Sequence, residues 1–132
     1  MENQEIIFKL SMFEQQLQQL QQQMQAVSSG ITELQSLHLG LNDIPGSVDK
    51  EIFARIGRGI YSKAKIISEE LMVNVGENNF VNKSVPETKK MIEEQINRLK
   101  EVEKELEENI ESTNKEFLEM VQEYQSREKT EN

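Results

Sequence analysis

Cysteine and tryptophan are absent from the 132 residues, and histidine occurs only once. Without cysteine the chain can form neither disulfides nor thiolate metal sites, and this composition suits a reducing cytoplasm. Aromatic residues are also few, five Phe and two Tyr, and hydrophobic residues make up only 36% of the chain. These absences argue against a large globular core.

Basic residues are scarce relative to acidic ones, since 15 Lys and Arg face 24 Asp and Glu and the net charge is −9. The acidic excess lies at the two ends, with −4 in residues 1–43 and −6 in residues 87–132, whereas residues 44–86 carry +1. Nucleic-acid binding is disfavoured because phosphate recognition needs clustered Lys and Arg. The sequence shows neither a secretory signal pattern nor an apolar run of membrane-spanning length. We expect a cytoplasmic protein with no nucleic-acid or membrane partner.

A heptad pattern runs through the first third of the chain. In the glutamine-rich stretch MFEQQLQQLQQQMQAV (residues 12–27), apolar residues recur at alternating steps of four and three. This spacing is typical of a coiled-coil helix rather than of a disordered tract. The pattern predicts a helix that ends near Gly40 to Asn42, ahead of Ile44-Pro45-Gly46. The positions of this apolar seam are Ile6, Leu10, Phe13, Leu17, Leu20, Met24, Val27, Ile31, Leu34, His38 and Leu41.

The last third repeats the pattern. Ser84-Val85-Pro86-Glu87 predicts a helix start, with a capping box and a proline in the first turn. Because the two seams are similar in length, we expect the helices to pair as an antiparallel hairpin, with a long parallel dimer as the alternative. The second seam, whose weak points are its two polar members, consists of Ile92, Ile96, Leu99, Glu103, Leu106, Ile110, Thr113, Phe117, Met120 and Tyr124.

The middle of the chain changes period. EIFARIGRGIYSKAKII (51–67) and ELMVNVGENNFVNKS (70–84) are rich in Ile, Val, Phe and Tyr and contain turn signals at Gly57-Arg58-Gly59 and Gly76-Glu77-Asn78-Asn79. We therefore expect two β-hairpins. Hairpins of this size bury too little surface to stand alone, and their open edges invite pairing with other chains. The middle segment is predicted to be an assembly element of an oligomer.

This order of elements resembles the α-class subunit of prefoldin, a chaperone of archaea and eukaryotes, over essentially the whole chain. The most specific parts are IGRGIYSKAKI and VNVGENNFVNKSVPETKKMIEEQI, which resemble the family's glycine turn, its strand ends and its aromatic-Val pair. Two hairpins rather than one indicate the α class, while ENN departs from the small residues commoner in the second turn. The matching positions are Gly57, Gly59, Tyr61, Lys63, Ala64, Ile66, Val73, Val75, Gly76, Phe80 and Val81.

The resemblance implies an α+β fold: a long antiparallel coiled-coil hairpin with two β-hairpins between the helices, as a single subunit. Residues 1–43 would form the first helix, 44–84 the hairpins and 85–132 the second helix. It also implies a hexamer of two α-class and four β-class subunits joined through intersubunit β-barrels. The residues expected to carry this oligomerisation are Ile56, Ile60, Tyr61, Ala64, Ile66, Val73, Val75, Phe80 and Val81.

The function implied by the resemblance is that of an ATP-independent holdase. The coiled-coil tips would capture unfolded client polypeptides and deliver them to a group II chaperonin, with no cofactor. A structural coiled-coil scaffold or spacer with a β oligomerisation element is the alternative function, and it has no need for apolar residues on open faces at the tips.

Apolar residues outside the seams indicate where clients would bind. Ile7, Phe8 and Met12 lie off the first seam, Leu118 and Val121 lie off the second, and an antiparallel hairpin brings both groups to one end. Met and Phe side chains suit varied partners because they repack. Frayed helix ends and contacts with another subunit's coiled coil are the alternatives. With their neighbours in the seams, the expected client-binding residues are Ile7, Phe8, Met12, Phe13, Phe117, Leu118, Val121 and Tyr124.

Catalysis and metal binding find no support in the sequence. His38 has no second ligand and no acid–base partner, so we expect it to be a polar residue of the seam. Gly57-Arg58-Gly59 lacks the lysine and the strand-to-helix context of a phosphate loop. The glutamates of the last helix lack the spacing of a Ca²⁺ loop. We expect no enzyme activity and no catalytic, cofactor or metal site.

Overall fold

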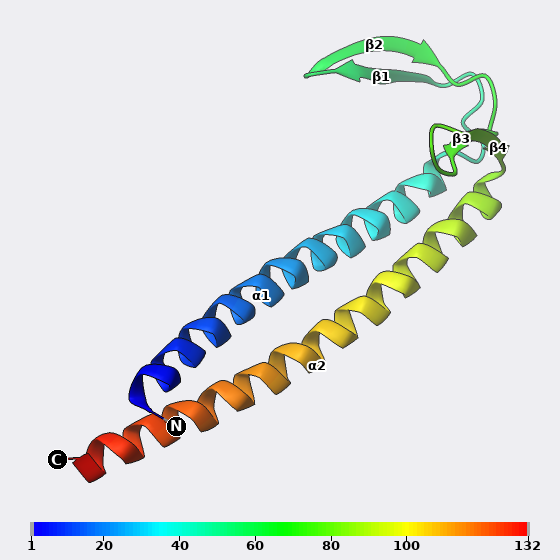
Figure 1. Ribbon diagram of the computed structural model, residues 1–132. Coiled ribbons are helices and arrows are strands. Elements are labelled where there is room, and N and C mark those ends of the chain that lie inside the picture. The colour runs from blue at the N-terminus through cyan, green and yellow to red at the C-terminus, as the bar shows by residue number, and fades with distance from the viewer. Residues whose placement is uncertain (1, 132) are drawn as a thin grey trace. The chain divides into compact units, whose positions relative to one another are not determined.

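The computed structural model describes residues 2–131 and contains two long helices separated in sequence by two β-hairpins (Figure 1). This arrangement confirms the predicted α+β fold class of a helical hairpin with two inserted β-hairpins. In chain order the elements are α1 (Asn3–Gly40), a 3-10 helix (Leu41–Asp43), β1 (Glu51–Gly57), β2 (Ile60–Lys65), β3 (Leu71–Asn74), β4 (Phe80–Lys83) and α2 (Val85–Glu131).

The chain divides into two compact units, each of which is described by itself. The first unit comprises Met1–Ile31 and Arg98–Asn132, and so contains the first part of α1 and the last part of α2. The second unit, Thr32–Asn97, contains the remainder of both helices and all four strands. Each unit holds its own stretch of the two apolar seams.

In the first unit, α1 and α2 lie side by side and antiparallel (Figure 1). Ser28 Oγ donates a hydrogen bond to Glu103 Oε2 at 3.1 Å. A methyl group placed on Gly30 would lie 3.5 Å from Cδ1 of Leu99. A later residue of α1 therefore lies beside an earlier residue of α2, as in an antiparallel pair. Every predicted seam residue of this unit is buried or half-buried, which confirms the seams.

The two polar positions of the second seam are accommodated in different ways. Glu103 is half-buried and has the Ser28 hydroxyl as a hydrogen-bond donor. Thr113 is buried. Polar residues in a coiled-coil seam reduce stability but favour one alignment of the helices, because any other alignment leaves them without partners. The pair formed by Ser28 and Glu103 therefore helps to set the register of the antiparallel pair.

Apolar side chains from α2 and from the 3-10 helix form the core of the second unit. Leu41, Val85, Ile92 and Ile96 are buried, and Ile92 is almost completely enclosed. Leu71 and Val73 of β3 are half-buried and line an open apolar groove together with Leu41 and Ile92. One face of the second hairpin thus packs toward the helices of this unit.

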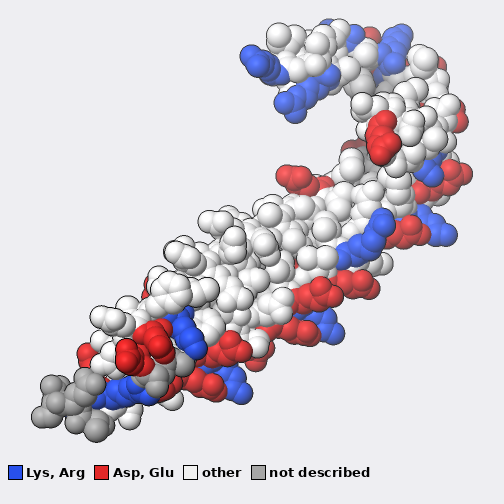
Figure 2. Space-filling model, in the orientation of Figure 1, with Lys and Arg blue, Asp and Glu red and all other residues white. Residues whose placement is uncertain are grey.

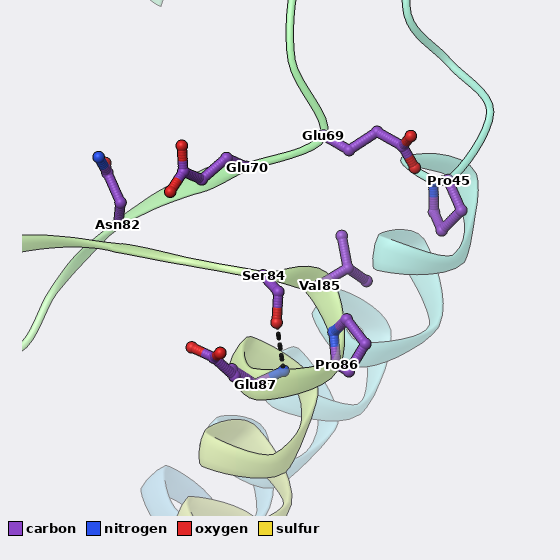
Figure 3. Close-up of a pocket in the computed structure, with 8 residues that line it drawn as sticks. All are labelled: Pro45, Glu69, Glu70, Asn82, Ser84, Val85, Pro86 and Glu87. Carbon is purple, nitrogen blue, oxygen red and sulfur yellow. Dashed lines mark hydrogen bonds between the residues drawn. The ribbon is translucent and has the colours of Figure 1, made fainter.

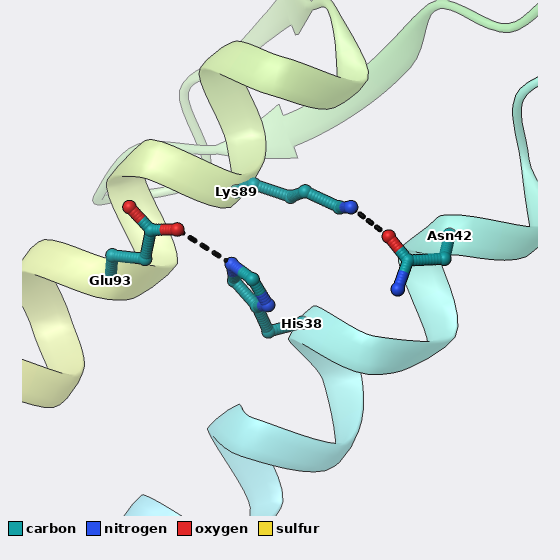
Figure 4. Close-up of polar contacts among 4 residues, drawn as sticks. All are labelled: His38, Asn42, Lys89 and Glu93. Carbon is teal, nitrogen blue, oxygen red and sulfur yellow. Dashed lines mark hydrogen bonds and ion pairs between the residues drawn. The ribbon is translucent and has the colours of Figure 1, made fainter.

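Two polar contacts also join the helices of the second unit (Figure 4). His38 Nε2 lies 2.9 Å from Glu93 Oε1, and Lys89 Nζ donates a hydrogen bond to Asn42 Oδ1. His38 is half-buried at its seam position. This confirms the prediction that the single histidine is a polar seam residue.

Helix α2 begins at a side-chain cap, as the sequence predicts. The Glu87 amide donates a hydrogen bond to Ser84 Oγ at 3.2 Å (Figure 3), and Thr88 Oγ1 donates to the Ser84 carbonyl at 2.8 Å. Pro86 lies in the first turn, where an amide has no partner within the helix and the missing N–H costs little. The cap gives the chain a defined change from strand β4 to helix.

Both hairpins are antiparallel and turn where the sequence places its turn signals. In the first hairpin Arg58 and Gly59 have positive φ angles of 44° and 79°. In the second, Glu77 and Asn78 have φ angles of 49° and 61°, and Asn74 Oδ1 accepts a hydrogen bond from the Gly76 amide at 2.9 Å. Glu77 and Asn78 therefore adopt the left-handed conformation that glycine favours, and of the two residues Asn tolerates it better.

Candidate functional site

Four of the residues predicted to bind clients expose more than half of their surface. These are Ile7, Phe8 and Met12 on α1 and Leu118 on α2. All belong to the first unit, whose antiparallel pairing places Met12 at about the level of Leu118 and brings both chain ends to one end of the unit (Figure 1). We call this cluster of Ile7, Phe8, Met12 and Leu118 the apolar tip.

The other four predicted residues are less accessible. Phe13, Phe117 and Tyr124 are half-buried because they belong to the seams between the helices. Val121, which the heptad pattern places off the seam, is also half-buried. These side chains therefore offer only part of their surface to a partner.

The first hairpin has two chemically different faces. In the observed register Ile52 pairs with Ala64, Ala54 with Ser62 and Gly57 with Ile60, and a bulge between Arg55 and Gly57 leaves Ile56 unpaired beside the last of these pairs. Because side chains alternate along a strand, this face carries small and aliphatic groups. We call it the smooth face, and its members are Ile52, Ala54, Ile56, Ile60, Ser62 and Ala64.

The opposite face of the first hairpin combines charges with aromatic rings. Phe53 lies across from Lys63, and Arg55 lies across from Tyr61. The register therefore separates Tyr61 from Ile56, Ile60 and Ala64, although the sequence analysis grouped them together. The sequence analysis did not include Ile52 among the candidate assembly residues. The alternation of Ile52, Ala54 and Ile56 at every second position could have placed it on the same face.

In the second hairpin, the predicted assembly residues differ in exposure, and Val73 and Val81 share a face because they pair directly across the strands. Val73 is half-buried against the helices of its unit, whereas Val75, Phe80 and Val81 are exposed. Met72, which the sequence analysis did not include, is exposed on the same face as Phe80. Ile66 is half-buried and its amide donates a backbone hydrogen bond to the Lys50 carbonyl.

An open hollow lies beside the start of α2 in the second unit (Figure 3). It contains the carboxylates of Glu69, Glu70 and Glu87, and Glu69 Oε1 accepts a hydrogen bond from the Gly46 amide at 3.2 Å. Its lining also includes the Ser84 hydroxyl, whose Oγ accepts the hydrogen bond from the Glu87 amide that caps α2. Within residues 2–131, no cluster of three His, Asp or Glu side chains has the arrangement of a metal site.

The apolar tip and the smooth face are exposed apolar surfaces, and such surfaces commonly bind other chains. A sequence model of the prefoldin family, described as "Prefoldin subunit", matches residues 13–130. The chain belongs to the prefoldin family. The match spans both hairpins, α1 from Phe13 onward and nearly all of α2, so Ile7, Phe8 and Met12 lie outside it.

A solved structure similar to this prefoldin subunit is that of filamentous PFD from Methanocaldococcus jannaschii, determined by cryo-EM. The two share 19% sequence identity with a TM-score of 0.77, and the alignment covers 91% of this chain and 98% of that chain. At this level of identity the similarity establishes the fold. Prefoldin is a family of chaperones and not of enzymes, so this chain is a prefoldin-type chaperone subunit.

Across residues 2–131, neither α1 nor α2 contains a segment that is both long and apolar enough to cross a membrane. Charged and amide side chains occupy most of the exposed positions of both helices.

Proposed function

We propose that this prefoldin subunit is an ATP-independent holdase that captures unfolded polypeptides at the apolar tip. The observation that carries the proposal is the exposure of Ile7, Phe8, Met12 and Leu118 together at one end of the first unit. Exposed apolar clusters on soluble proteins mark interaction sites. Unfolded chains expose the apolar side chains that such a surface can cover.

The energy available at the apolar tip fits reversible capture. Full burial of an aliphatic or aromatic side chain contributes about 1.5–3 kcal/mol, so covering the exposed half of each tip residue contributes about 1 kcal/mol. Four such contributions, reduced by the ordering of the client, give weak binding per subunit. Several subunits in one assembly would hold a client more tightly through multivalency.

The proposed assembly is the α-class position in a hexamer with four β-class subunits, joined through the hairpins. Its support is the smooth face of the first hairpin, where Ile52, Ile56 and Ile60 are exposed. A two-stranded hairpin with an exposed apolar face and free edges gains stability by pairing with other chains. Delivery of the client to a group II chaperonin, in the cytoplasm, completes the proposal by analogy with the family.

Suppression of client aggregation tests the holdase function. A chemically denatured client is diluted into buffer without ATP, with this chain and a β-class partner, and light scattering is followed. The tip variant Phe8→Ser, Met12→Ser, Leu118→Ser is expected to lose protection. The matched control Leu37→Ser, Leu39→Ser, Val102→Ser removes exposed apolar side chains from other parts of the same helices and is expected to protect like the wild type.

Both variants must first be shown to form the same oligomer as the wild type. Equal protection by the wild type and the tip variant would refute capture at the apolar tip. Absence of protection by the wild type itself would favour a coiled-coil scaffold, for which open apolar residues at the tip have no role.

A further inference from the structure

The outer surface of α1 in the first unit differs in charge from that of α2. Residues 15–32 contain no Asp, Glu, Lys or Arg, whereas charged residues occur throughout the α2 part of the same unit. Figure 2 shows red and blue side chains following α2, while the surface over α1 is largely white. The heptad seam requires apolar residues only on the inner face, so it does not explain why the outer face of α1 lacks charge.

The exposed face of α1 opposite the seam continues directly from the apolar tip. Phe8 is followed at steps of four, three, four and three by Met12, Gln15, Gln19 and Gln22, and all five are exposed. This spacing aligns their side chains along one face of a helix. We call Gln15, Gln19 and Gln22 the amide stripe.

We propose that the amide stripe binds the main chain of an extended, unfolded polypeptide whose apolar side chains are held at Phe8 and Met12. The inference rests on the proposed holdase function and adds a second kind of contact to it. The capture surface of this subunit is then apolar at one end and hydrogen-bonding along the rest.

The chemistry of a primary amide matches that of an extended backbone. Each residue of an unfolded segment offers one N–H donor and one C=O acceptor, and a glutamine side chain supplies both a donor group and an acceptor. Because the stripe is neutral, contact with a client requires no desolvation of an ion and does not depend on the client's charge. A charged face such as that of α2 would repel clients of the same sign.

The surface from Phe8 to Gln22 is also long enough to hold a short extended segment of a client. The 14 residues that separate Phe8 from Gln22 span about 21 Å at about 1.5 Å per residue. An extended segment rises about 3.3 Å per residue, so about six client residues lie along the surface. A segment of this size occurs in any unfolded chain.

A second copy of this chain fits the amide stripe less well. The backbone groups of a helix are already hydrogen-bonded within that helix, so a helical partner would not need the amides. A coiled-coil partner would need apolar residues at heptad spacing, and Gln15, Gln19 and Gln22 interrupt that pattern after Met12. The stripe is therefore suited to a chain whose backbone is free.

A binding experiment with a modified backbone tests the inference. The probe is a fluorescein-labelled ten-residue peptide of Phe, Leu, Val, Ser and Thr, and a second probe has the same sequence with every backbone amide nitrogen methylated. The stripe variant Gln15→Ala, Gln19→Ala, Gln22→Ala keeps the helix, because Ala is the best helix former. The matched control Gln16→Ala, Gln21→Ala, Gln23→Ala removes the same number of exposed glutamines from positions that flank the seam.

Fluorescence anisotropy with the full-length chain in its native oligomer is expected to show about tenfold weaker binding of the unmodified peptide by the stripe variant. The control should bind like the wild type. The methylated peptide should bind equally weakly to the wild type and the stripe variant, because it lacks the donors that the glutamines accept from.

Three results would overturn the inference. Unchanged binding by the stripe variant, with loss in the Phe8→Ser, Met12→Ser variant, would leave the holdase function standing without a role for the amides. Equal loss in the stripe variant and its control would indicate a nonspecific effect of the substitutions. A changed oligomeric state of the stripe variant alone, measured by sedimentation velocity, would assign the stripe to contact between copies of the chain.

Discussion

Replacing Ile56 and Ile60 by serine removes two large aliphatic side chains from the smooth face of the first hairpin. Ile56 is 71% exposed and Ile60 is 61% exposed, so neither contributes much to packing within the chain. If the smooth face is the assembly surface, the loss of these side chains weakens the association of subunits. The double variant should fold as the wild type does and fail to assemble.

The expected magnitude follows from these exposures. Full burial of an isoleucine side chain is worth about 1.5–3 kcal/mol, so covering the exposed two thirds is worth about 1–2 kcal/mol for each residue. Together the two substitutions should weaken association by about 3 kcal/mol, which is about a hundredfold in the dissociation constant.

The opposite face of the same hairpin supplies the control. Phe53 and Tyr61 are 67% and 56% exposed, close to the values for Ile56 and Ile60, and they point the other way in the observed register. Phe53→Ser, Tyr61→Ser therefore removes a similar apolar area. It should change the dissociation constant less than about threefold, in line with ordinary surface substitutions.

Sedimentation velocity over a range of concentrations, supported by native mass spectrometry, measures both variants against the wild type. Far-UV circular dichroism checks that the helices are intact. If Phe53→Ser, Tyr61→Ser dissociates the assembly as strongly as Ile56→Ser, Ile60→Ser, the division into two faces is wrong. Assembly through the second hairpin would be indicated if neither variant had an effect.

Two further predictions concern stability. Ile92→Ala should lower the free energy of unfolding by about 3 kcal/mol, whereas Ile67→Ala should change it by less than about 0.5 kcal/mol, because Ile92 is 1% exposed and Ile67 is 87% exposed. Urea unfolding at fixed protein concentration measures the free energy of unfolding of both variants. Equal effects would contradict the assignment of Ile92 to the core of the second unit. Ser84→Ala should cost about 1 kcal/mol and Ser84→Asn much less, because Asn can replace the Ser84 hydroxyl as acceptor for the Glu87 amide. Hydrogen exchange of the first-turn amides of α2 measures this, and equal protection in both variants would show that the cap has no role.

Much of the fold could be predicted from the sequence because its signals are local. A seam at alternating steps of three and four determines which face of a helix is apolar, and Ile6, Ile31 and Leu106 are buried as that pattern requires. The turns at Gly57-Arg58-Gly59 and Gly76-Glu77-Asn78-Asn79 depend on a few neighbouring residues with special backbone preferences. The cap at Ser84 is equally local.

The candidate site was predicted in part. The heptad pattern identified Ile7, Phe8, Met12 and Leu118 as apolar residues outside the seams, and each exposes more than half of its surface. It treated Val121 in the same way, yet this side chain is half-buried. Heptad positions are assigned from the sequence of one helix. How far a side chain beside the seam is covered also depends on the side chains of the opposing helix, which the assignment does not include.

The sequence by itself determined the helices, the turns, the absence of charge in residues 15–32 of α1 and the membership of the prefoldin family, because each depends on residue types at short spacing. Only the tertiary structure decided which residues meet. Ser28 and Glu103 lie 75 positions apart, and the position of Tyr61 on the face opposite Ile56 depends on the strand register and on the bulge after Arg55. Such pairings arise from the alignment of segments distant in sequence, and shifting that alignment by one residue changes every partner and, in a strand, every face.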